Sequence, residues 1–145
     1  MKPLLVFSAL LAMAVLLTAA AATAPVTYVA HDKVAEVLAK GGPLASGPDY
    51  RVTGNRRAGP GQVEVHDKET DIFYVIDGEA TVVTGGTVIG GKTTAPDQIR
   101  GTEIQGGETR HLAKGDFVVI PAGTPHWFKE VPKSINYYTV KVVKP

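Results

Sequence analysis

Two segments of this 145-residue chain carry residue types that bind metal ions or move protons. The first contains Glu64, His66 and Asp71, and the second ends in His126. Imidazole nitrogens and carboxylate oxygens bind divalent transition metals, and two histidines with one carboxylate form a recognised site for non-haem iron. A carboxylate that is not a ligand can act as a general base. Because side chains alternate along a strand, Glu64 and His66 are expected on the same face.

The elements around the second segment are expected to present His126 at the start of a strand. Residues Phe117–Ile120 form a continuous apolar run, which is typical of a strand buried on both faces. Pro121 and Gly123 then predict a sharp turn, since proline fixes φ and glycine accepts a left-handed conformation.

Both segments resemble the two signature motifs of the cupin superfamily. The second follows the family pattern closely, with Gly115, Pro121, Gly123 and His126 at the family's spacing. The resemblance covers most of the chain that follows the N-terminal leader. It is closest to small single-domain cupins, cupin 2-like, of an exported bacterial type.

The first segment departs from the family pattern, which has two histidines one residue apart, followed by a glutamate and a glycine. Counting back from Gly78 aligns Asp71 with the glutamate, His66 with the second histidine and Glu64 with the first. The resemblance therefore implies the metal ligands Glu64, His66, Asp71 and His126. Iron, manganese, nickel and zinc all accept such a mixed set. The alternative is a barrel without metal whose histidines form hydrogen bonds in a ligand pocket.

The chain divides into three parts. Residues 1–22 have a positive start, an apolar stretch and small residues at the end, as in a cleaved signal peptide, so the protein is expected in the periplasm or outside the cell. Residues 23–48 contain a predicted helix at 32–41 that Asp32 would cap. Residues 49–145 are expected to form the barrel. The predicted fold is all-β, a single jelly-roll-like cupin barrel (a double-stranded β-helix) with one short N-terminal helix after the signal peptide.

The barrel region reads as short strands separated by Gly, Pro, Asp and Asn. The expected strands are Tyr50–Thr53, Gln62–His66, Ile72–Ile76, Ala80–Thr84, Phe117–Ile120, Pro125–Phe128 and Ile135–Val143. Asp77-Gly78 predicts a hairpin turn between two of them. Residues 85–107, rich in Gly and Thr, are expected to form either a long loop or irregular strands around Val88-Ile89 and Ile99–Ile104.

Side chains beside the motifs are assigned by strand parity. Phe73 and Phe128 should point inward as pocket walls. Tyr74 and Trp127 should point outward, on the outer side of the barrel or at a dimer contact. Glu69 is expected on a solvated face.

Other candidates lie outside the motifs. Of Arg56 and Arg57, one could reach an anionic substrate at the barrel mouth. Tyr137 and Tyr138 would suit a homodimer interface or an ordinary barrel wall.

Charge composition argues against nucleic acid as a partner. The chain has 15 Lys and Arg against 14 Asp and Glu, and Lys2 lies in the leader, so the mature chain is balanced and shows no basic stripe. It has no cysteine, and the fold must therefore rest on burial alone. No membrane contact is expected after leader removal.

The sequence leaves three functions open, of which two are better supported. The first is a metal-dependent enzyme of dioxygenase, isomerase or lyase type acting on a small molecule, with Glu64 or Asp71 as the candidate general base. The second is a non-catalytic module that binds a small molecule. A purely structural cupin that forms a dimer is a third, weaker alternative.

Overall fold

The computed structural model describes residues 23–144. The predicted signal peptide, residues 1–22, lies outside this range. The described elements are α1 (His31–Lys40), β1 (Gly42–Ser46), β2 (Tyr50–Arg57), β3 (Val63–His66), β4 (Glu69–Thr84), β5 (Thr87–Ile89), β6 (Lys92–Ala95), β7 (Gln98–Gly101), β8 (Glu103–Gln105), β9 (Glu108–Ala113), β10 (Phe117–Ile120), β11 (His126–Glu130) and β12 (Ile135–Val143). None of the described helical residues forms a helix long and apolar enough to cross a membrane.

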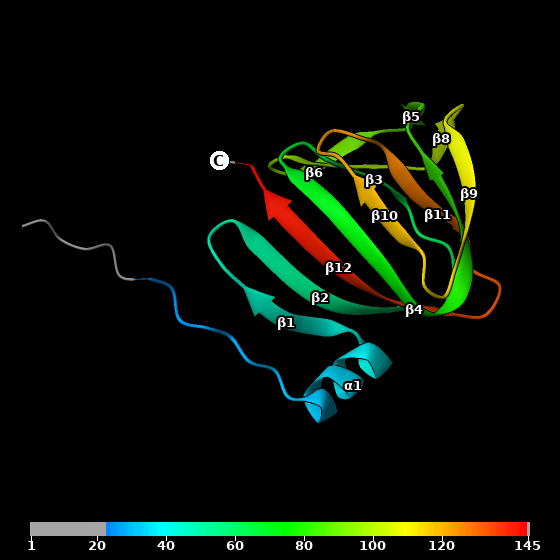
Figure 1. Ribbon diagram of the computed structural model, residues 1–145. Helices are drawn as coiled ribbons and strands as arrows, with labels where there is room; N and C mark the ends of the chain where they lie inside the picture. Colours follow the sequence, from blue (N-terminus) through cyan, green and yellow to red (C-terminus); the bar gives the residue numbers. More distant parts are fainter. Residues whose placement is uncertain (1–22, 145) are drawn as a thin grey trace, which may run out of the picture.

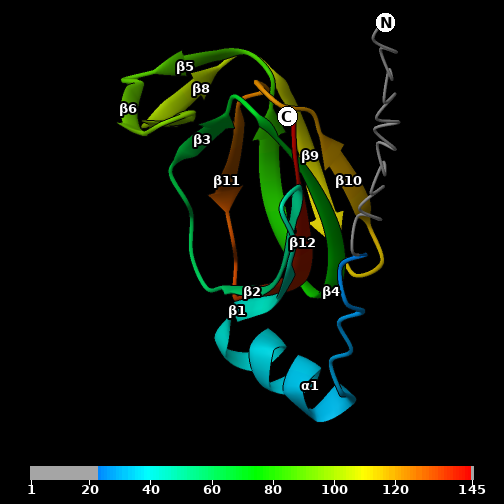
Figure 2. The same cartoon turned by 90° about the vertical axis from the view of Figure 1, so that its left-hand side faces the viewer.

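Ten of the described strands form one antiparallel sheet that folds into two layers, as Figures 1 and 2 show. The first half of β4 pairs with β12 and β10, and its second half pairs with β9 and β11. Beyond β12 lie β2 and β1, and beyond β11 lie β3, β7 and β6. The single strand β4 therefore belongs to both layers. The predicted all-β fold is confirmed.

The hairpin predicted at Asp77-Gly78 is wrong, because β4 runs through both residues without turning back. Gly78 has a φ of 81°, and the pairing of β4 with β12 shifts register two residues earlier, at Ile76. A Cβ atom at Gly78 would lie 2.0 Å from the carbonyl oxygen of Ser134. The Asp-Gly signal therefore marks an irregular point where β4 passes from one layer to the other.

The helix α1 begins and ends one residue earlier than expected. Its N-cap is Ala30, which makes no side-chain cap, so Asp32 is a residue of the first turn and the predicted cap is wrong. Gly41 follows the last turn with a φ of 81°. Val37 is the buried residue of the helix and packs on β2, where a Cβ at Gly54 would lie 2.8 Å from its Cγ1.

The N-terminal segment also supplies a strand that the sequence did not indicate. The strand β1 pairs antiparallel with β2, with a register shift between Pro43 and Ala45. Residues 23–48 therefore extend the sheet and are not only a helical lead-in to it (Figure 1).

The buried apolar residues form two clusters, one between the layers and one on the outer face of the layer that contains β3 and β11. The larger cluster consists of Phe73, Val75, Ala80, Val82, Leu112, Ile120, Phe128, Val131, Ile135 and Tyr137. The smaller one contains Val63, Val83 and Ile104, with Trp127 packed against it. Burial of this apolar surface is the main stabilising contribution, since the chain has no cysteine.

The expectation that β10 is buried on both faces is wrong. Phe117 is 63% exposed and Val119 is 52% exposed, whereas Ile120 is buried. The strand pairs with β4 at one edge and presents an apolar outer face. An apolar run alone does not show how many faces of a strand are covered.

Residues 85–107 form short strands, as one of the two expectations proposed. The strands β5 and β8 pair with each other, whereas β7 pairs with β3 and β6. The strands β6 and β7 are therefore part of the barrel wall beside β3, which carries two of the candidate ligands, whereas β5 and β8 form a separate two-stranded sheet (Figure 2).

Candidate metal centre

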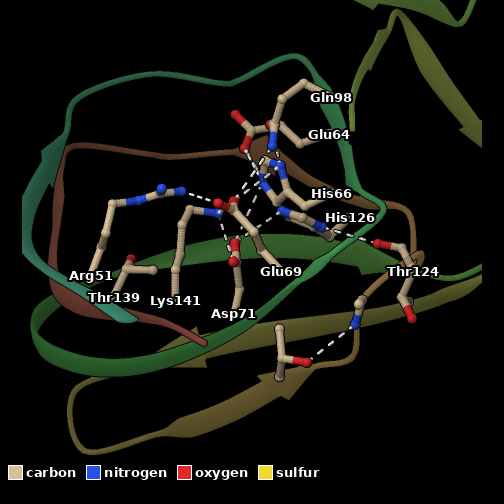
Figure 3. A network of polar contacts seen from close by, with 12 residues as sticks. Arg51, Glu64, His66, Glu69, Asp71, Gln98, Thr124, His126, Thr139 and Lys141 are labelled. Carbon is tan, nitrogen blue, oxygen red and sulfur yellow. Dashed lines mark hydrogen bonds and ion pairs between the residues drawn. The ribbon is translucent and has the colours of Figure 1, made fainter. Parts of the chain in front are cut away.

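Four sequence-predicted residues bring their ligand atoms together inside the barrel (Figure 3). The Nε2 atom of His66 lies 3.2 Å from Glu64 Oε2 and 3.6 Å from Asp71 Oδ2. The Nε2 atom of His126 lies 3.8 Å and 3.6 Å from the same two oxygens. Two imidazole nitrogens and two carboxylate oxygens therefore face a common point.

Strand pairing explains this convergence. Glu64 and His66 lie on the same face of β3, and His126 at the start of β11 is paired directly with Glu64. Asp71 lies near the start of β4, in the half of this strand that pairs with β10 and β12, so its carboxylate approaches the group from the other layer. The aromatic centroids of His66 and His126 are 5.2 Å apart.

Each histidine is oriented by an oxygen acceptor on its other ring nitrogen. The Nδ1 atom of His66 contacts the side-chain oxygen of Gln98, and Nδ1 of His126 lies 3.1 Å from the carbonyl oxygen of Thr124. An Nδ1–H that donates to oxygen leaves the Nε2 lone pair free, which is the usual arrangement around metal-ligating histidines.

Both Nε2 atoms are buried and have no hydrogen-bond partner among the described residues. His66, His126 and Asp71 are 4%, 3% and 2% exposed. Buried polar atoms are normally satisfied, and two orphaned nitrogens beside two carboxylates are an exception that a cation would remove. The donor set fits a divalent transition metal ion.

A fifth ligand-type side chain, Glu69, lies close to this group. It is 8% exposed, so the expected solvated face is wrong, and its Oε2 atom lies 3.9 Å from Nδ1 of His66. Candidate ligand atoms of His66, Glu69 and Asp71 lie within 4.8 Å of one another, as do those of Glu64, His66 and His126. The two sets share His66.

Three cations neutralise the three carboxylates. Lys141 Nζ lies 2.6 Å from Asp71 Oδ1, while Arg100 pairs with Glu64 and Arg51 with Glu69. Burial lowers the pKa of Lys141, and the charge of Asp71 opposes that effect. Burial raises the pKa of Glu64, but its contacts with His126, His66 and Arg100 together outweigh burial and hold the pKa well below its usual range.

Sequence reasoning missed Gln98, Arg100 and Lys141. Gln98 and Arg100 belong to β7, and they reach the centre because β7 pairs with β3. The parity of β12 contains a signal for Lys141, because this residue alternates with the inward-facing Tyr137 and Thr139.

A cavity of about 170 Å³ lies beside the centre. Its lining residues are Thr53, Asn55, Arg57, Gln62, Glu64, Asp71, Phe73, His126, Phe128, Tyr137, Thr139 and Lys141. Phe73 and Phe128 thus lie where strand parity placed them. The cavity combines an aromatic wall with charged groups, as small-molecule sites do.

The other aromatic assignments have mixed outcomes. Tyr74 points outward and is 45% exposed. Trp127 also leaves the barrel interior but is partly buried, and it donates to the carbonyl oxygen of Gly61 at 2.8 Å. Tyr137 is 6% exposed inside the barrel, so of its two suggested places the barrel wall is confirmed.

Comparison with known proteins identifies one matching family model, described as the EutQ-like cupin domain, over residues 48–142. A search of curated proteins found no match. The solved structures that resemble the chain include KdgF from Halomonas sp., with 20% sequence identity and a TM-score of 0.52, covering 72% of this chain and 80% of that one. A protein from Bacillus halodurans has 16% identity and a TM-score of 0.58, covering 83% and 84%. The Cnp3 cupin domain of Schizosaccharomyces pombe has 12% identity and a TM-score of 0.52, covering 72% and 60%. At these identities the likeness shows the fold alone.

Proposed function

The chain belongs to the EutQ-like cupin family, and from this premise we propose that its barrel holds one divalent transition metal ion and acts as a metal-dependent enzyme on a small molecule. The ligands in this proposal are His66, His126, Asp71 and Glu64. The bound ion would supply Lewis-acid polarisation of a substrate oxygen. Iron, manganese, nickel and zinc all suit these ligands.

The pair of unpartnered, buried Nε2 atoms carries the proposal. A histidine that only forms hydrogen bonds in a ligand pocket needs no fixed acceptor on Nδ1 and no free Nε2 lone pair. Here both His66 and His126 have the two features together. This arrangement supports a metal ligand role for each.

The two carboxylates differ in what they can do. Asp71 is almost fully buried and held by Lys141, which suits a fixed ligand. Glu64 lines the cavity with a more exposed side chain, 28%, and its low pKa keeps it ionised at neutral pH. We assign Glu64 to the substrate side, where it can accept a hydrogen bond or a proton from a bound molecule.

A second function, a non-catalytic binding module, is supported by the ion pairs of the site. Arg100 and Lys141 already neutralise Glu64 and Asp71, so the barrel is charge-balanced with no ion bound. This module would retain its ligand after chelation, whereas the enzyme would lose turnover.

Elemental analysis of the purified protein tests the proposal. The wild-type protein is compared with His66→Ala/His126→Ala, and with His111→Ala as a control, because His111 is exposed on β9 and pairs with Glu79. Near-stoichiometric metal in the wild type and the control, with none in the double variant, is the expected result. A folded wild type that stays free of metal after incubation with iron, manganese, nickel and zinc would exclude the enzyme.

We also propose that the protein works in the periplasm or outside the cell, on the pattern of residues 1–22. Expression of the full chain in a bacterial host, followed by fractionation and intact mass measurement, tests this. The expected product lies outside the cytoplasm and lacks the leader; a full-length cytoplasmic product contradicts it.

A homodimer is a further proposal, supported by the exposed apolar face of Tyr74, Phe117 and Val119. Light scattering on the purified protein should give twice the mass of the chain. A Phe117→Ser/Val119→Ser variant should be monomeric, and a wild-type monomer at all concentrations would contradict this proposal.

A further inference from the structure

The cavity beside the candidate metal centre has, besides Lys141, a second cationic group, Arg57, which the proposed function does not use. We propose that Arg57 binds the carboxylate group of a small organic acid and thereby sets the substrate class of this site. This inference rests on the proposed function only for the reaction at the end of the acid that lies away from Arg57. Binding of the carboxylate itself requires no metal.

The charge balance of the cavity singles out Arg57. Two cationic side chains line the cavity, Arg57 and Lys141. Lys141 is committed to Asp71 and Glu69, at 2.6 Å and 3.4 Å. Within residues 23–144, Arg57 forms no ion pair with any carboxylate. The cavity thus has one positive charge that an anionic ligand can neutralise.

The hydrogen-bonding state of Arg57 leads to the same conclusion. Its Nε atom is buried and has no hydrogen-bond partner among the described residues. Leaving a buried donor of a charged group unsatisfied is costly, and a ligand oxygen inside the cavity would remove that cost.

The guanidinium of Arg57 is packed against its neighbours. Its Cζ atom lies 4.8 Å from the ring centroid of Phe128, and Phe128 stacks on Tyr137 with centroids 5.2 Å apart. On another side, a Cβ added at Gly61 would lie 2.7 Å from Nη1, so the absence of a side chain at this position leaves room for the guanidinium. A planar, positioned guanidinium matches the two oxygens of a carboxylate.

The carboxylates that line the cavity favour a monoanion as the ligand. Glu64 and Asp71 line the same cavity, so a phosphate dianion would bring excess negative charge close to both. A single carboxylate matches the single unpaired guanidinium. The volume of about 170 Å³ limits the acid to a small molecule.

The strand geometry allows one ligand to reach both ends. Tyr137, beside Arg57, and Lys141, beside Asp71, lie on one face of β12, four residues apart, or about 13 Å along the strand. The long side chains of Arg57 and Lys141 shorten the remaining span. Glu64 and His126 line the same cavity as Arg57, so an acid whose carboxylate meets Arg57 would extend toward them.

Nuclear magnetic resonance on metal-free protein provides the direct test. The protein is labelled with nitrogen-15, and the Arg57 Nε–H signal is followed during titration with acetate and glycolate, with acetamide and glycolamide as neutral matches. We expect the acids to shift this signal and the amides to leave it in place. Equal effects of acid and amide, or no shift with either acid, would overturn the proposal.

Variants separate the roles of charge and geometry. Loss of a charge-assisted hydrogen bond in Arg57→Gln should weaken glycolate binding about 10- to 100-fold. Arg57→Lys keeps the charge without the planar fork and should bind glycolate with intermediate affinity. Arg56→Gln is the matched control, because Arg56 is the preceding residue, is exposed and does not line the cavity. If Arg56→Gln weakens glycolate binding as much as Arg57→Gln, the effect comes from the overall charge of the protein, and the specific contact with Arg57 is contradicted.

Failure of the carboxylate-site proposal can be distinguished from failure of the metal proposal. Metal content of Arg57→Gln should equal that of the wild type, which also shows that the variant is folded. A wild type that refuses all metals but shows the acid-dependent Arg57 shift would disprove the metal proposal and leave the carboxylate site standing. The reverse pattern, bound metal with no shift, would disprove the carboxylate site alone.

Discussion

Lys141 donates a hydrogen bond of 2.6 Å to Oδ1 of Asp71, and the two residues are directly paired on the adjacent strands β12 and β4. The second carboxylate oxygen of Asp71 is thereby left to face His66 and His126, at 3.6 Å from each Nε2. The lysine both orients this carboxylate and adds a positive charge next to the candidate cation site. These two effects oppose each other in metal binding.

We expect Lys141→Met to reveal both effects. Without metal, the variant leaves Asp71 buried without its partner, which should lower the free energy of unfolding by about 3 kcal/mol. With the positive charge removed, divalent metal should bind about tenfold more tightly. Urea unfolding of the metal-free protein and competitive metal titration measure the two quantities. Lys144→Met is the control, since Lys144 is exposed near the same strand end, and weaker metal binding in Lys141→Met would show that orientation outweighs charge.

The contact between Gln98 and His66 predicts a metal-affinity effect from outside the ligand set. Replacing Gln98 with Ala removes the acceptor for Nδ1 of His66 and should weaken metal binding by about 10- to 100-fold. The matched control is Gln105→Ala, an exposed glutamine on β8. Metal titration in the presence of a chromogenic chelator compares the metal affinities of the two variants with that of the wild type. Unchanged affinity in Gln98→Ala would show that His66 is oriented by packing alone.

Tyr137 predicts a loss of stability at high pH. Burial raises the pKa of its phenol above the usual value, and the nearby charge of Arg57 opposes that rise. Because the folded-state pKa is above the unfolded value, this contribution to stability is complete below about pH 10 and is lost as pH rises through the folded-state pKa.

A Tyr137→Phe variant should abolish this part of the pH profile of thermal unfolding. Tyr138→Phe, at the next residue and on the opposite face of β12, should retain it. Arg57→Gln should move the ionisation of Tyr137 to still higher pH, as followed by near-ultraviolet absorbance. Identical alkaline profiles for wild type and Tyr137→Phe would contradict the assignment.

The backbone at Gly78 predicts an intolerant position. Gly78→Ala combines a positive φ with a Cβ placed 2.0 Å from the carbonyl oxygen of Ser134, and it should lower the free energy of unfolding by roughly 3 kcal/mol or more. Gly85→Ala is the control, since Gly85 has a similar φ, 74°, and open space around its Cβ position. It should cost only about 1 kcal/mol. Equal losses of unfolding free energy in the two variants, measured by chemical denaturation, would show that the positive φ alone determines the destabilisation.

Much of the fold could be predicted from the sequence because two local patterns are strong. The spacing from Gly115 to His126 and the alternating strands identified the cupin barrel, and the inward parity of Phe73 and Phe128 placed them correctly at the cavity. The errors have local causes. A Gly with positive φ serves both a tight turn and a bulge, so Asp77-Gly78 could not reveal that β4 continues.

The surroundings of the site were less accessible to prediction. Glu64, His66 and Asp71 are close in sequence, whereas Gln98 and Lys141 arrive through long-range strand pairing that no local pattern encodes. Glu69 resembled a solvated residue because its neighbours are polar, yet Arg51 and Lys141 neutralise it in a buried position. Charge complementarity across distant strands becomes visible only when the register is known.

Because β4 passes through both layers, it links their unfolding. Its 16 residues are hydrogen-bonded to partners in each layer, so neither layer can detach while the other remains intact. Unfolding should then be a single cooperative event, with the slowest amide hydrogen exchange along β4. Exchange of a bound ion or small molecule with solvent then requires no separation of the layers and can proceed through motions of the side chains that line the cavity. Residence time would then depend on rotamer barriers near the cavity, independently of the global stability of the protein.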